Sequence, residues 1–310
     1  MRVVRTSAQT FWRFCATAAL IAAAAGPIAA DEAPEPASSA NRGTGTVATA
    51  VGAPVAGQRS DPGAHQTQSI DLGISPYEPV YFSLGSNDVL NAKFQLSLKF
   101  RPFGPTDDTV NGTYPWNDLY LAYTQTSVWD LEAESKPFYD TSYRPALFYQ
   151  RRSLGKMFGG GFSFRGGVEH ESNGKGADDS RSINILFIRP SWWWTLDQRW
   201  AIAFSPNIYT YVERSENRDI AEYRGYVDWQ ITLAQERGLR LSTTFRLGTE
   251  GHRSALVDLS YPFADITALR AIGLQHGYLH VQYFNGYGET ILSYNRRLSS
   301  QLRIGLMLVR

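Results

Sequence analysis

The sequence is almost free of cysteine. Cys15 is the only cysteine in the chain of 310 residues. It lies in an apolar N-terminal stretch, and the letters "RFC" around it do not resemble a lipoprotein cleavage site. The part of the chain after this stretch therefore has no thiol, which excludes disulfides, cysteine catalysis and cysteine-ligated metals.

An excess of charge of either sign is also missing. The chain carries 30 basic and 29 acidic side chains, and its formal net charge is +1. Proteins that bind nucleic acid through its phosphates need a surplus of Lys and Arg. The charge balance therefore gives no reason to propose a nucleic-acid partner.

Long apolar runs occur only at the N-terminus. Arg2, Arg5 and Arg13 precede an apolar run from about residue 14 to residue 28, and small residues and an acidic segment follow. This order predicts a secretory signal peptide over residues 1–30. The alternative, an uncleaved membrane anchor, is less favoured because the run is shorter than the roughly 20 residues that a spanning helix needs.

The next segment lacks aromatic residues and is rich in Ala, Gly, Pro, Ser and Thr. Such a composition cannot bury a core, so residues 31–70 are predicted to be a disordered leader or linker. The folded domain is expected to span residues 71–310.

That domain has strong period-two alternation and no helix-length apolar segment. In "AKFQLSLKF", residues Phe94, Leu96, Leu98 and Phe100 fall on one face, and the charged and polar residues fall on the other. Similar alternation occurs in "YRGYVDWQITL", "LRLSTTFRL" and "QLRIGLMLV". Alternation by itself fits either a soluble sandwich or a membrane barrel.

Three features favour the barrel. The polar faces carry Arg, Lys and Gln along whole strands, and the strands have the roughly 9–11 residues that a tilted strand needs to cross a bilayer. Trp192, Trp193, Trp194 and Trp200 resemble an interfacial aromatic girdle. Together with the signal peptide, these features predict an all-β protein of the bacterial outer membrane, a twelve-stranded antiparallel transmembrane β-barrel.

The expected strands begin near Ala92, Asp118, Arg144, Gly160, Ser182, Arg199, Glu222, Arg237, Arg253, Gly277, Thr290 and Gln301. Their number, about twelve, is even, as single-chain bacterial barrels require. The charged Arg310 stands where a terminal aromatic residue is expected, and the sequence offers no explanation for it.

The stretch "GVEHESNGKGADDSRSIN" carries the side chains of greatest chemical interest. Alternation directs Glu169 and Glu171 into the lumen, because a carboxylate facing lipid is costly, and it directs His170 and Ser172 outward. A hairpin through the following loop brings Asn184 beside His170.

A serine, a histidine and an amide can form a catalytic triad. The histidine takes the proton of the weakly nucleophilic serine, and the amide accepts the other imidazole N–H and fixes the tautomer. Alternatively, His170 and Ser172 are interfacial residues at a strand end. The spacing alone leaves both interpretations open.

The residues resemble the outer membrane phospholipase A family. "EHESNG" (169–174) and "SRSIN" (180–184) are similar to its His-x-Ser-Asn-Gly and Ser-Arg-Ser-x-Asn signatures, with a matching loop length. Further similar segments are "FQLSLKF", "AYTQTSVWDL", "SKPFYDTSYRPALF", "LSYPF" and "GYGETILSYN", so that the resemblance runs from about Tyr77 to the end.

The resemblance implies a calcium-dependent enzyme that hydrolyses acyl esters of membrane phospholipids (sn-1, sn-2 and lysophospholipids) and is active as a homodimer. Ser172 would be the nucleophile, His170 the proton acceptor and Asn184 the residue that orients the histidine.

The resemblance also implies a Ca²⁺ site and a dimer interface. The calcium ligands would be the backbone carbonyl of Lys175, Ser180 and, from the other subunit of the dimer, Ser135. Gln125 matches a polar residue at the dimer interface.

The chain departs from the family pattern in the loop before Ser180. Asp178 and Asp179 stand side by side where the family usually has one acid, earlier in the turn. They could add oxygen ligands for Ca²⁺, but solvated loop charges are the favoured interpretation. Ile185 replaces a polar residue that is common on the lumen face.

Two other functions remain as alternatives. A lipid A deacylase is another barrel esterase with His-x-Ser, but Asn184 and the number of strands argue against it. A non-enzymatic porin would need an open lumen and no triad on its outer face. His276 and His280 are expected to be a turn residue and a lumen residue.

Overall fold

The computed structural model describes residues 73–86 and 89–310, so the predicted signal peptide (1–30), the whole predicted leader (31–70) and the first two residues of the predicted folded domain lie outside the described residues. Within these ranges, no helix is long and apolar enough to cross a membrane.

The described chain is almost entirely β-structure. Its strands are β1 (Ile74–Ser75), β2 (Val80–Ser86), β3 (Leu90–Phe100), β4 (Leu119–Asp130), β5 (Phe138–Arg151), β6 (Lys156–Met157), β7 (Gly160–Ser172), β8 (Ser182–Thr195), β9 (Trp200–Phe204), β10 (Asn207–Glu213), β11 (Val227–Gln235), β12 (Arg240–Leu247), β13 (Arg253–Pro262), β14 (Tyr278–Tyr287) and β15 (Arg297–Val309). The short helices are η2 (Pro115–Asp118), η3 (Ala177–Asp179), α2 (Ile220–Arg224), η4 (Phe263–Asp265) and α3 (Thr267–Ala271).

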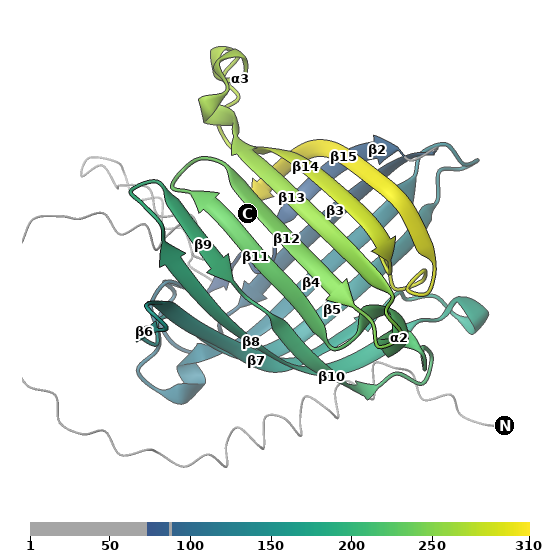
Figure 1. The fold of residues 1–310 in the computed structure, drawn as a ribbon, viewed down its shortest axis with the longest axis horizontal. Coiled ribbons are helices and arrows are strands. Elements are labelled where there is room, and N and C mark those ends of the chain that lie inside the picture. The colour runs from purple at the N-terminus through teal and green to yellow at the C-terminus, as the bar shows by residue number, and fades with distance from the viewer. Residues whose placement is uncertain (1–72, 87–88) are drawn as a thin grey trace, which may run out of the picture. The chain divides into compact units, whose positions relative to one another are not determined.

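The strands form one closed antiparallel barrel (Figure 1). Each long strand pairs with the next along the chain, and β15 pairs with β2 to close the ring. β9 and β10 occupy a single position, because both pair with β8 on one side and with β11 on the other, and only Ser205 and Pro206 separate them. With β1 and β6 as two-residue additions, the barrel has twelve strands. The predicted fold class is confirmed.

One expected strand is absent and one observed strand was not expected, so the two errors cancel in the count. Strand β2 was not expected at all, and no strand begins at Thr290. The alternating residues after Thr290 instead form a loop that packs inward, with Ile291 fully buried and Tyr294 only 5% exposed. Glu222, expected at the start of a strand, lies in α2, and the strand begins at Val227. A loop that folds back into the lumen thus has the same alternation of apolar and polar residues as a strand.

The two faces of the wall follow the alternation. On β3, Leu96 and Leu98 are 55% and 45% exposed, whereas Lys93 and Lys99 are 5% and 3% exposed. Since successive strand residues point to opposite faces, the apolar residues form the outer surface and the lysines point into the lumen. A polar, hydrogen-bonded interior is typical of outer-membrane barrels.

An aromatic belt runs along the outside near one end of β7 to β11. The centre of the Trp192 ring lies 5.3 Å from the ring centre of Phe162 and 6.1 Å from that of Phe204. The ring centres of Phe204 and Trp229 are 6.2 Å apart. This position is consistent with a membrane–water girdle. Of the expected girdle residues, Trp192 contributes to the belt, whereas Trp193 alternates to the opposite face.

Arg310 has a structural role at the same end of the barrel. Its guanidinium donates to the Gly238 carbonyl oxygen at 2.5 Å and lies 4.2 Å from the centre of the Tyr278 ring. These contacts tie the end of β15 to the β11–β12 turn and to β14. The charged terminal residue is therefore accommodated by a cation–π contact.

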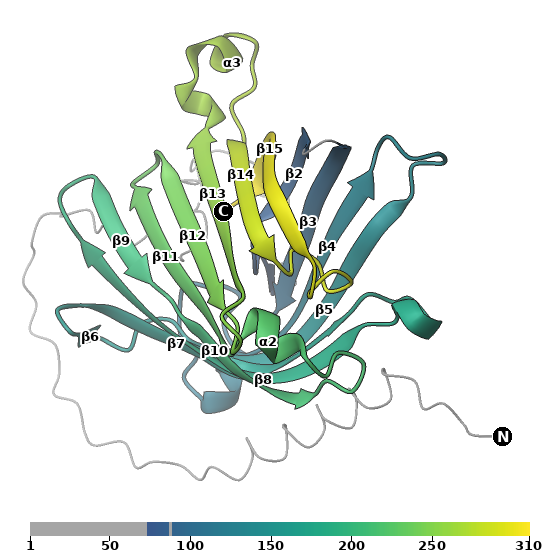
Figure 2. The same ribbon diagram turned by 45° about the vertical axis from the view of Figure 1, so that its right-hand side comes forward.

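The two ends of the barrel differ (Figure 2). α3 and its loop project from one end, whereas α2 covers the opposite end. The loop after β7 and the loops after β4, β10 and β14 all belong to the α2 end, because antiparallel strands alternate in direction. The α2 end is therefore where the candidate site lies.

Candidate active site

His170 and Asn184 face each other across neighbouring strands. They are direct partners in the β7–β8 pairing, and His170 Nδ1 lies 2.8 Å from Asn184 Oδ1. In this arrangement the imidazole donates its Nδ1–H to the amide oxygen, which leaves Nε2 as the proton acceptor. The structure thus brings together the histidine and the amide that the sequence proposed as partners.

This pair lies on the outer face of the barrel. Leu186 and Ile188 share the face of Asn184 and are 50% and 45% exposed. Glu169 and Glu171, on either side of His170, point the other way and line the lumen. His170 and Asn184 are themselves only 6% and 4% exposed, and the scarcity of water around them strengthens their hydrogen bond.

Ser172 follows His170 by two residues and ends β7. It therefore shares the outward face of His170, and it pairs with Tyr143 on β5 and with Ser182 on β8. Its side chain is half-buried. A hydroxyl at the rim of the wall, beside an imidazole oriented by an amide, has the composition of a nucleophilic triad.

The loop between the strands is organised by Asn173, which the sequence reasoning did not single out. Its amide oxygen accepts the backbone N–H groups of Lys175 (3.2 Å) and Arg181 (3.1 Å), and its Nδ2 donates to the Asp179 carbonyl oxygen at 2.8 Å. Gly174, next to it, has a φ of +66°, a conformation that favours glycine. Asn173 and Gly174 therefore form a turn directly after Ser172, the last residue of β7.

A carboxylate from another loop reaches the predicted calcium ligand Ser180. The Ser180 hydroxyl donates to Glu216 Oε2 at 3.0 Å, and Glu216 precedes α2. Its neighbour Asn217 is fully buried and donates to the Ser182 carbonyl oxygen at 2.7 Å. No spacing rule connects Glu216 to Ser180, because the two are brought together only by the fold.

The remaining sequence candidates occupy different places. Asp178 and Asp179 are exposed in η3, and their backbone carbonyls accept from Arg181 and Asn173, so their carboxylates stay available to solvent. Ser135 is exposed in the β4–β5 turn, where it has a φ of +61°. Within residues 73–86 and 89–310, no three His, Cys, Asp or Glu side chains gather as a metal cluster.

Gln125 lies on the outer face of β4. Its amide oxygen accepts a hydrogen bond from the Tyr123 hydroxyl at 3.0 Å. Its amide nitrogen Nε2 donates to Ser127 Oγ at 3.4 Å. A polar ladder on a lipid-facing wall is costly unless it is covered. Its position agrees with the interface role that the resemblance implies.

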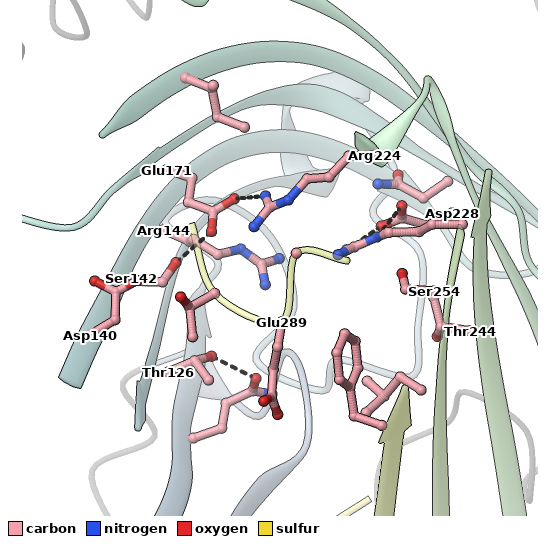
Figure 3. Close-up of a pocket in the computed structure, with 18 of the residues that line it drawn as sticks. Thr126, Asp140, Ser142, Arg144, Glu171, Arg224, Asp228, Thr244, Ser254 and Glu289 are labelled. Atoms are coloured by element: carbon pink, nitrogen blue, oxygen red, sulfur yellow. Dashed lines mark hydrogen bonds and ion pairs between the residues drawn. The ribbon is translucent and has the colours of Figure 1, made fainter. Parts of the chain in front are cut away.

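Charged groups fill the lumen behind the site (Figure 3). The interior pocket has a volume of about 160 Å³ and includes Arg144, Glu171, Arg224, Asp228 and Glu289. Burial by itself would raise the pKa of Glu289, but the positive charges of Lys93 and Arg303 lower it instead. In the same loop, burial and a hydrogen bond to Asp219 raise the pKa of Tyr294.

Comparison with known proteins places this geometry in context. The family model described as Phospholipase A1 matches residues 66–308. The phospholipase A1 of Salmonella typhimurium is 33% identical over 227 residues, which cover 69% of this chain and 67% of the relative. That of Escherichia coli strain K12 is 32% identical over the same length.

Solved structures are similar as well. Outer membrane phospholipase A from Escherichia coli has a TM-score of 0.63 and 26% sequence identity, with 79% of this chain and 94% of that chain covered. The Salmonella typhi outer membrane phospholipase, solved as a dimer with bound calcium, has a TM-score of 0.62 and 27% identity over 76% of this chain and 92% of that chain. This chain belongs to the phospholipase A1 family of outer-membrane β-barrels.

Proposed function

We propose that this protein is a calcium-dependent outer-membrane phospholipase A that hydrolyses the acyl esters of glycerophospholipids, at sn-1 and sn-2 and in lysophospholipids. The observation that carries the proposal is the 2.8 Å contact between His170 Nδ1 and Asn184 Oδ1, beside Ser172 on the outer wall. Family membership and the enzymatic names of the relatives support it.

The chemistry follows from the three side chains. Ser172 Oγ attacks the acyl carbonyl while His170 Nε2 takes its proton, and the same proton goes to the oxygen of the leaving lysophospholipid. Water then attacks the acyl-serine with His170 again as the base. The fatty acid leaves and Ser172 regains its proton.

Asn184 holds the imidazole of His170 in the tautomer that these proton transfers require. Because an amide is neutral, it stabilises the imidazolium less than aspartate would. The low exposure of both side chains compensates in part, because a hydrogen bond is stronger away from water.

A calcium ion fits the residues next to the triad. The Lys175 carbonyl, the Ser180 hydroxyl and the Glu216 carboxylate are hard oxygen donors, which Ca²⁺ prefers, and Ser180 and Glu216 are already in contact. Bound there, the ion would act as a Lewis acid that stabilises negative charge on the acyl oxygen.

Dimerisation would complete the site. Ser135 of a second copy is proposed as a further calcium ligand, and Gln125 as part of the interface. The dimeric, calcium-bound Salmonella typhi structure supports this. Secretion through the signal peptide over residues 1–30 would deliver the chain to the outer membrane. Activity would then depend on phospholipid reaching the outer leaflet and on dimer formation.

Calcium dependence can be tested with the purified protein on detergent-dispersed phospholipid. Excess chelator is expected to abolish release of fatty acid, and added Ca²⁺ to restore it. Glu216→Gln keeps an acceptor for Ser180 but loses the charge, so it is expected to need about 10–100-fold more calcium, the usual effect of removing a supporting ligand. The matched control is Glu222→Gln, an acidic residue on α2 near the same end. Full activity in chelator would remove the calcium role.

The lumen argues against the porin alternative. Glu289, in the loop after β14, bonds Lys93 at 3.1 Å and Arg303 at 2.5 Å, so the loop is held inside the barrel. Its buried Ile291 closes the space further. A lipid A deacylase is disfavoured by the twelve strands and the family match.

We therefore expect no stable ion conductance from the purified protein in planar bilayers. The measurement is single-channel recording, with a known open porin as the positive control. A steady conductance that Glu289→Ala does not increase would contradict a closed lumen.

A further inference from the structure

Lys175 lies in the turn after β7, three residues beyond Ser172. The turn is held by Asn173, whose amide oxygen accepts the backbone N–H of Lys175 at 3.2 Å. It packs over the outer face of β5, because a Cβ at Gly174 would lie 3.0 Å from Cε2 of the Tyr143 ring. The backbone of Lys175 is therefore held beside the triad, at the α2 end of the outer wall.

The ammonium group of Lys175 lies farther toward the α2 end than Ser172 does. Strand β5 extends beyond Tyr143, the partner of Ser172, to its first residue Phe138 at the α2 end. On this extension, the Tyr139 carbonyl oxygen accepts a hydrogen bond from Lys175 Nζ at 2.9 Å. Since a strand rises about 3.4 Å per residue, Tyr139 lies about 13 Å along β5 from Tyr143.

Lys175 carries the available positive charge of this turn. The loop from Asn173 to Arg181 contains two basic residues, Lys175 and Arg181. Arg181 Nη1 donates to two carbonyl oxygens of the same loop at 2.8 Å and 2.7 Å, so its guanidinium is used within the loop. An ammonium group has three N–H donors, and the bond to Tyr139 uses one of them. None of the ion pairs among the described residues involves Lys175, so its charge is available to an anion.

The apolar wall determines the direction in which a lipid would bind. Leu186 and Ile188 lie on the outer face of β8, on the α3 side of Asn184, and they are 50% and 45% exposed. Acyl chains are expected to follow these side chains, because apolar groups associate away from water. A phospholipid whose ester lies at Ser172 then has its glycerol and its phosphate on the α2 side, which is the side of Lys175.

We propose that Lys175 Nζ binds the phosphate of the substrate lipid and makes the enzyme prefer acyl esters that carry a phosphate over uncharged ones. Lysine binds phosphate as a point charge, and its flexible stem allows Nζ to move from the Tyr139 carbonyl toward the lipid while the turn keeps its place. The inference rests on the proposed function, because it names the part of the substrate that is recognised beside the same triad.

The test compares two substrates with the same acyl chain, lysophosphatidylcholine and monoacylglycerol, in an uncharged detergent with saturating calcium. Lys175→Met removes the charge but keeps the stem and the backbone carbonyl that is proposed for calcium. It is expected to lower kcat/KM on lysophosphatidylcholine by about tenfold, the effect of losing one hydrogen bond to a charged group, and to change kcat/KM on monoacylglycerol by less than about twofold. Lys175→Arg keeps the charge and should retain most of the preference.

Lys156→Met is the matched control. Lys156 is exposed on β6, at the α3 end of the barrel before β7 begins. The substitution removes the same charge far from the site, so both values of kcat/KM should equal those of the wild type. Heat-modifiable gel mobility checks that every variant forms the barrel.

A second readout separates this inference from the proposed function. An uncharged fluorophosphonate probe reacts with an activated serine whether or not phospholipid is the substrate, and its labelling rate at Ser172 should be the same in the wild type, Lys175→Met and Lys156→Met. The loss on lysophosphatidylcholine is thus judged against two neutral reactions, labelling and hydrolysis of monoacylglycerol. No loss on lysophosphatidylcholine, or an equal loss in the neutral reactions, would overturn phosphate recognition alone. A wild-type protein that labels at Ser172 but does not hydrolyse lysophosphatidylcholine would overturn the proposed function.

Discussion

Ser172→Ala is expected to reduce phospholipid hydrolysis by about four to six orders of magnitude, because removal of the nucleophile of a triad eliminates the covalent route. The geometry supports so large an effect. Ser172 is the only hydroxyl-bearing residue on β7 that shares the outward face of His170 and lies within two residues of it. Binding of lipid to the apolar outer wall does not depend on this hydroxyl, so the loss should fall on kcat and leave KM nearly unchanged.

The measurement is release of fatty acid from detergent-dispersed phospholipid with calcium present. Ser163→Ala is the control, since Ser163 lies on the same strand near its other end. It should retain wild-type activity. Fluorophosphonate labelling should disappear in Ser172→Ala and persist in Ser163→Ala. Unchanged hydrolysis by Ser172→Ala would refute the triad.

The second large effect is expected at the seam of the barrel, the pairing of β15 with β2 that closes the ring. Gly305 on β15 pairs with His280 on β14 and with Ser83 on β2. His280 Nδ1 bonds Ser83 Oγ at 2.8 Å, across the intervening strand, and its Nε2 bonds Asp258 Oδ1 at 2.9 Å. The predicted lumen position of His280 is confirmed, and the residue is fully buried. Its bonds tie the first strand of the ring to the last ones.

Only glycine fits between the two bonded side chains. A Cβ at Gly305 would lie 2.0 Å from the Phe82 carbonyl oxygen and 2.8 Å from Ser83 Oγ. Gly305→Val must therefore displace backbone at the seam and break the Ser83–His280 bond. Overpacking costs about 1–3 kcal/mol, and leaving buried polar groups unsatisfied costs about 1–3 kcal/mol more.

We therefore expect Gly305→Val to lower the free energy of unfolding by about 4 kcal/mol or more, a loss that few single substitutions reach. Urea unfolding in detergent and heat-modifiable mobility would measure it. Gly166→Val is the control, because a Cβ there first meets the ring end of Phe164 at 3.0 Å, a side chain that can move. Equal stability of the two variants would contradict the role of the seam.

Two of the hydrogen-bonded histidines, His170 and His280, illustrate how the face of the barrel wall separates roles. His280 has a serine and an aspartate as partners, the composition of a hydrolase triad, yet Ser83 and His280 are both fully buried. His170 has an amide partner and lies on the wall that meets lipid. Access to substrate, and not the set of side chains, therefore favours His170 as the catalytic residue.

Much of this protein could be predicted from the sequence because β-structure has a period of two. Alternation alone directed Glu169 and Glu171 inward and His170 outward, and the contacts of both glutamates with lumenal partners confirm that assignment. The same rule failed at Thr290, where a loop folded into the lumen has alternating buried residues without a strand.

Other features depend on contacts between residues that are far apart in the sequence. Glu216 reaches Ser180, and Arg224 reaches Glu171 across 53 positions, only because the β10–β11 loop folds over the β7–β8 hairpin. No local pattern encodes such contacts.

The sequence by itself determined the class of fold, the faces of the strands and the identity of the candidate triad, because these follow from periodicity and from a local motif. The tertiary structure alone decided the seam at Gly305, the carboxylate beside Ser180 and the contact of Arg224 with Glu171. These depend on the register between strands and on where the closed ring places its loops, and pairing in a barrel is fixed only when the whole ring closes.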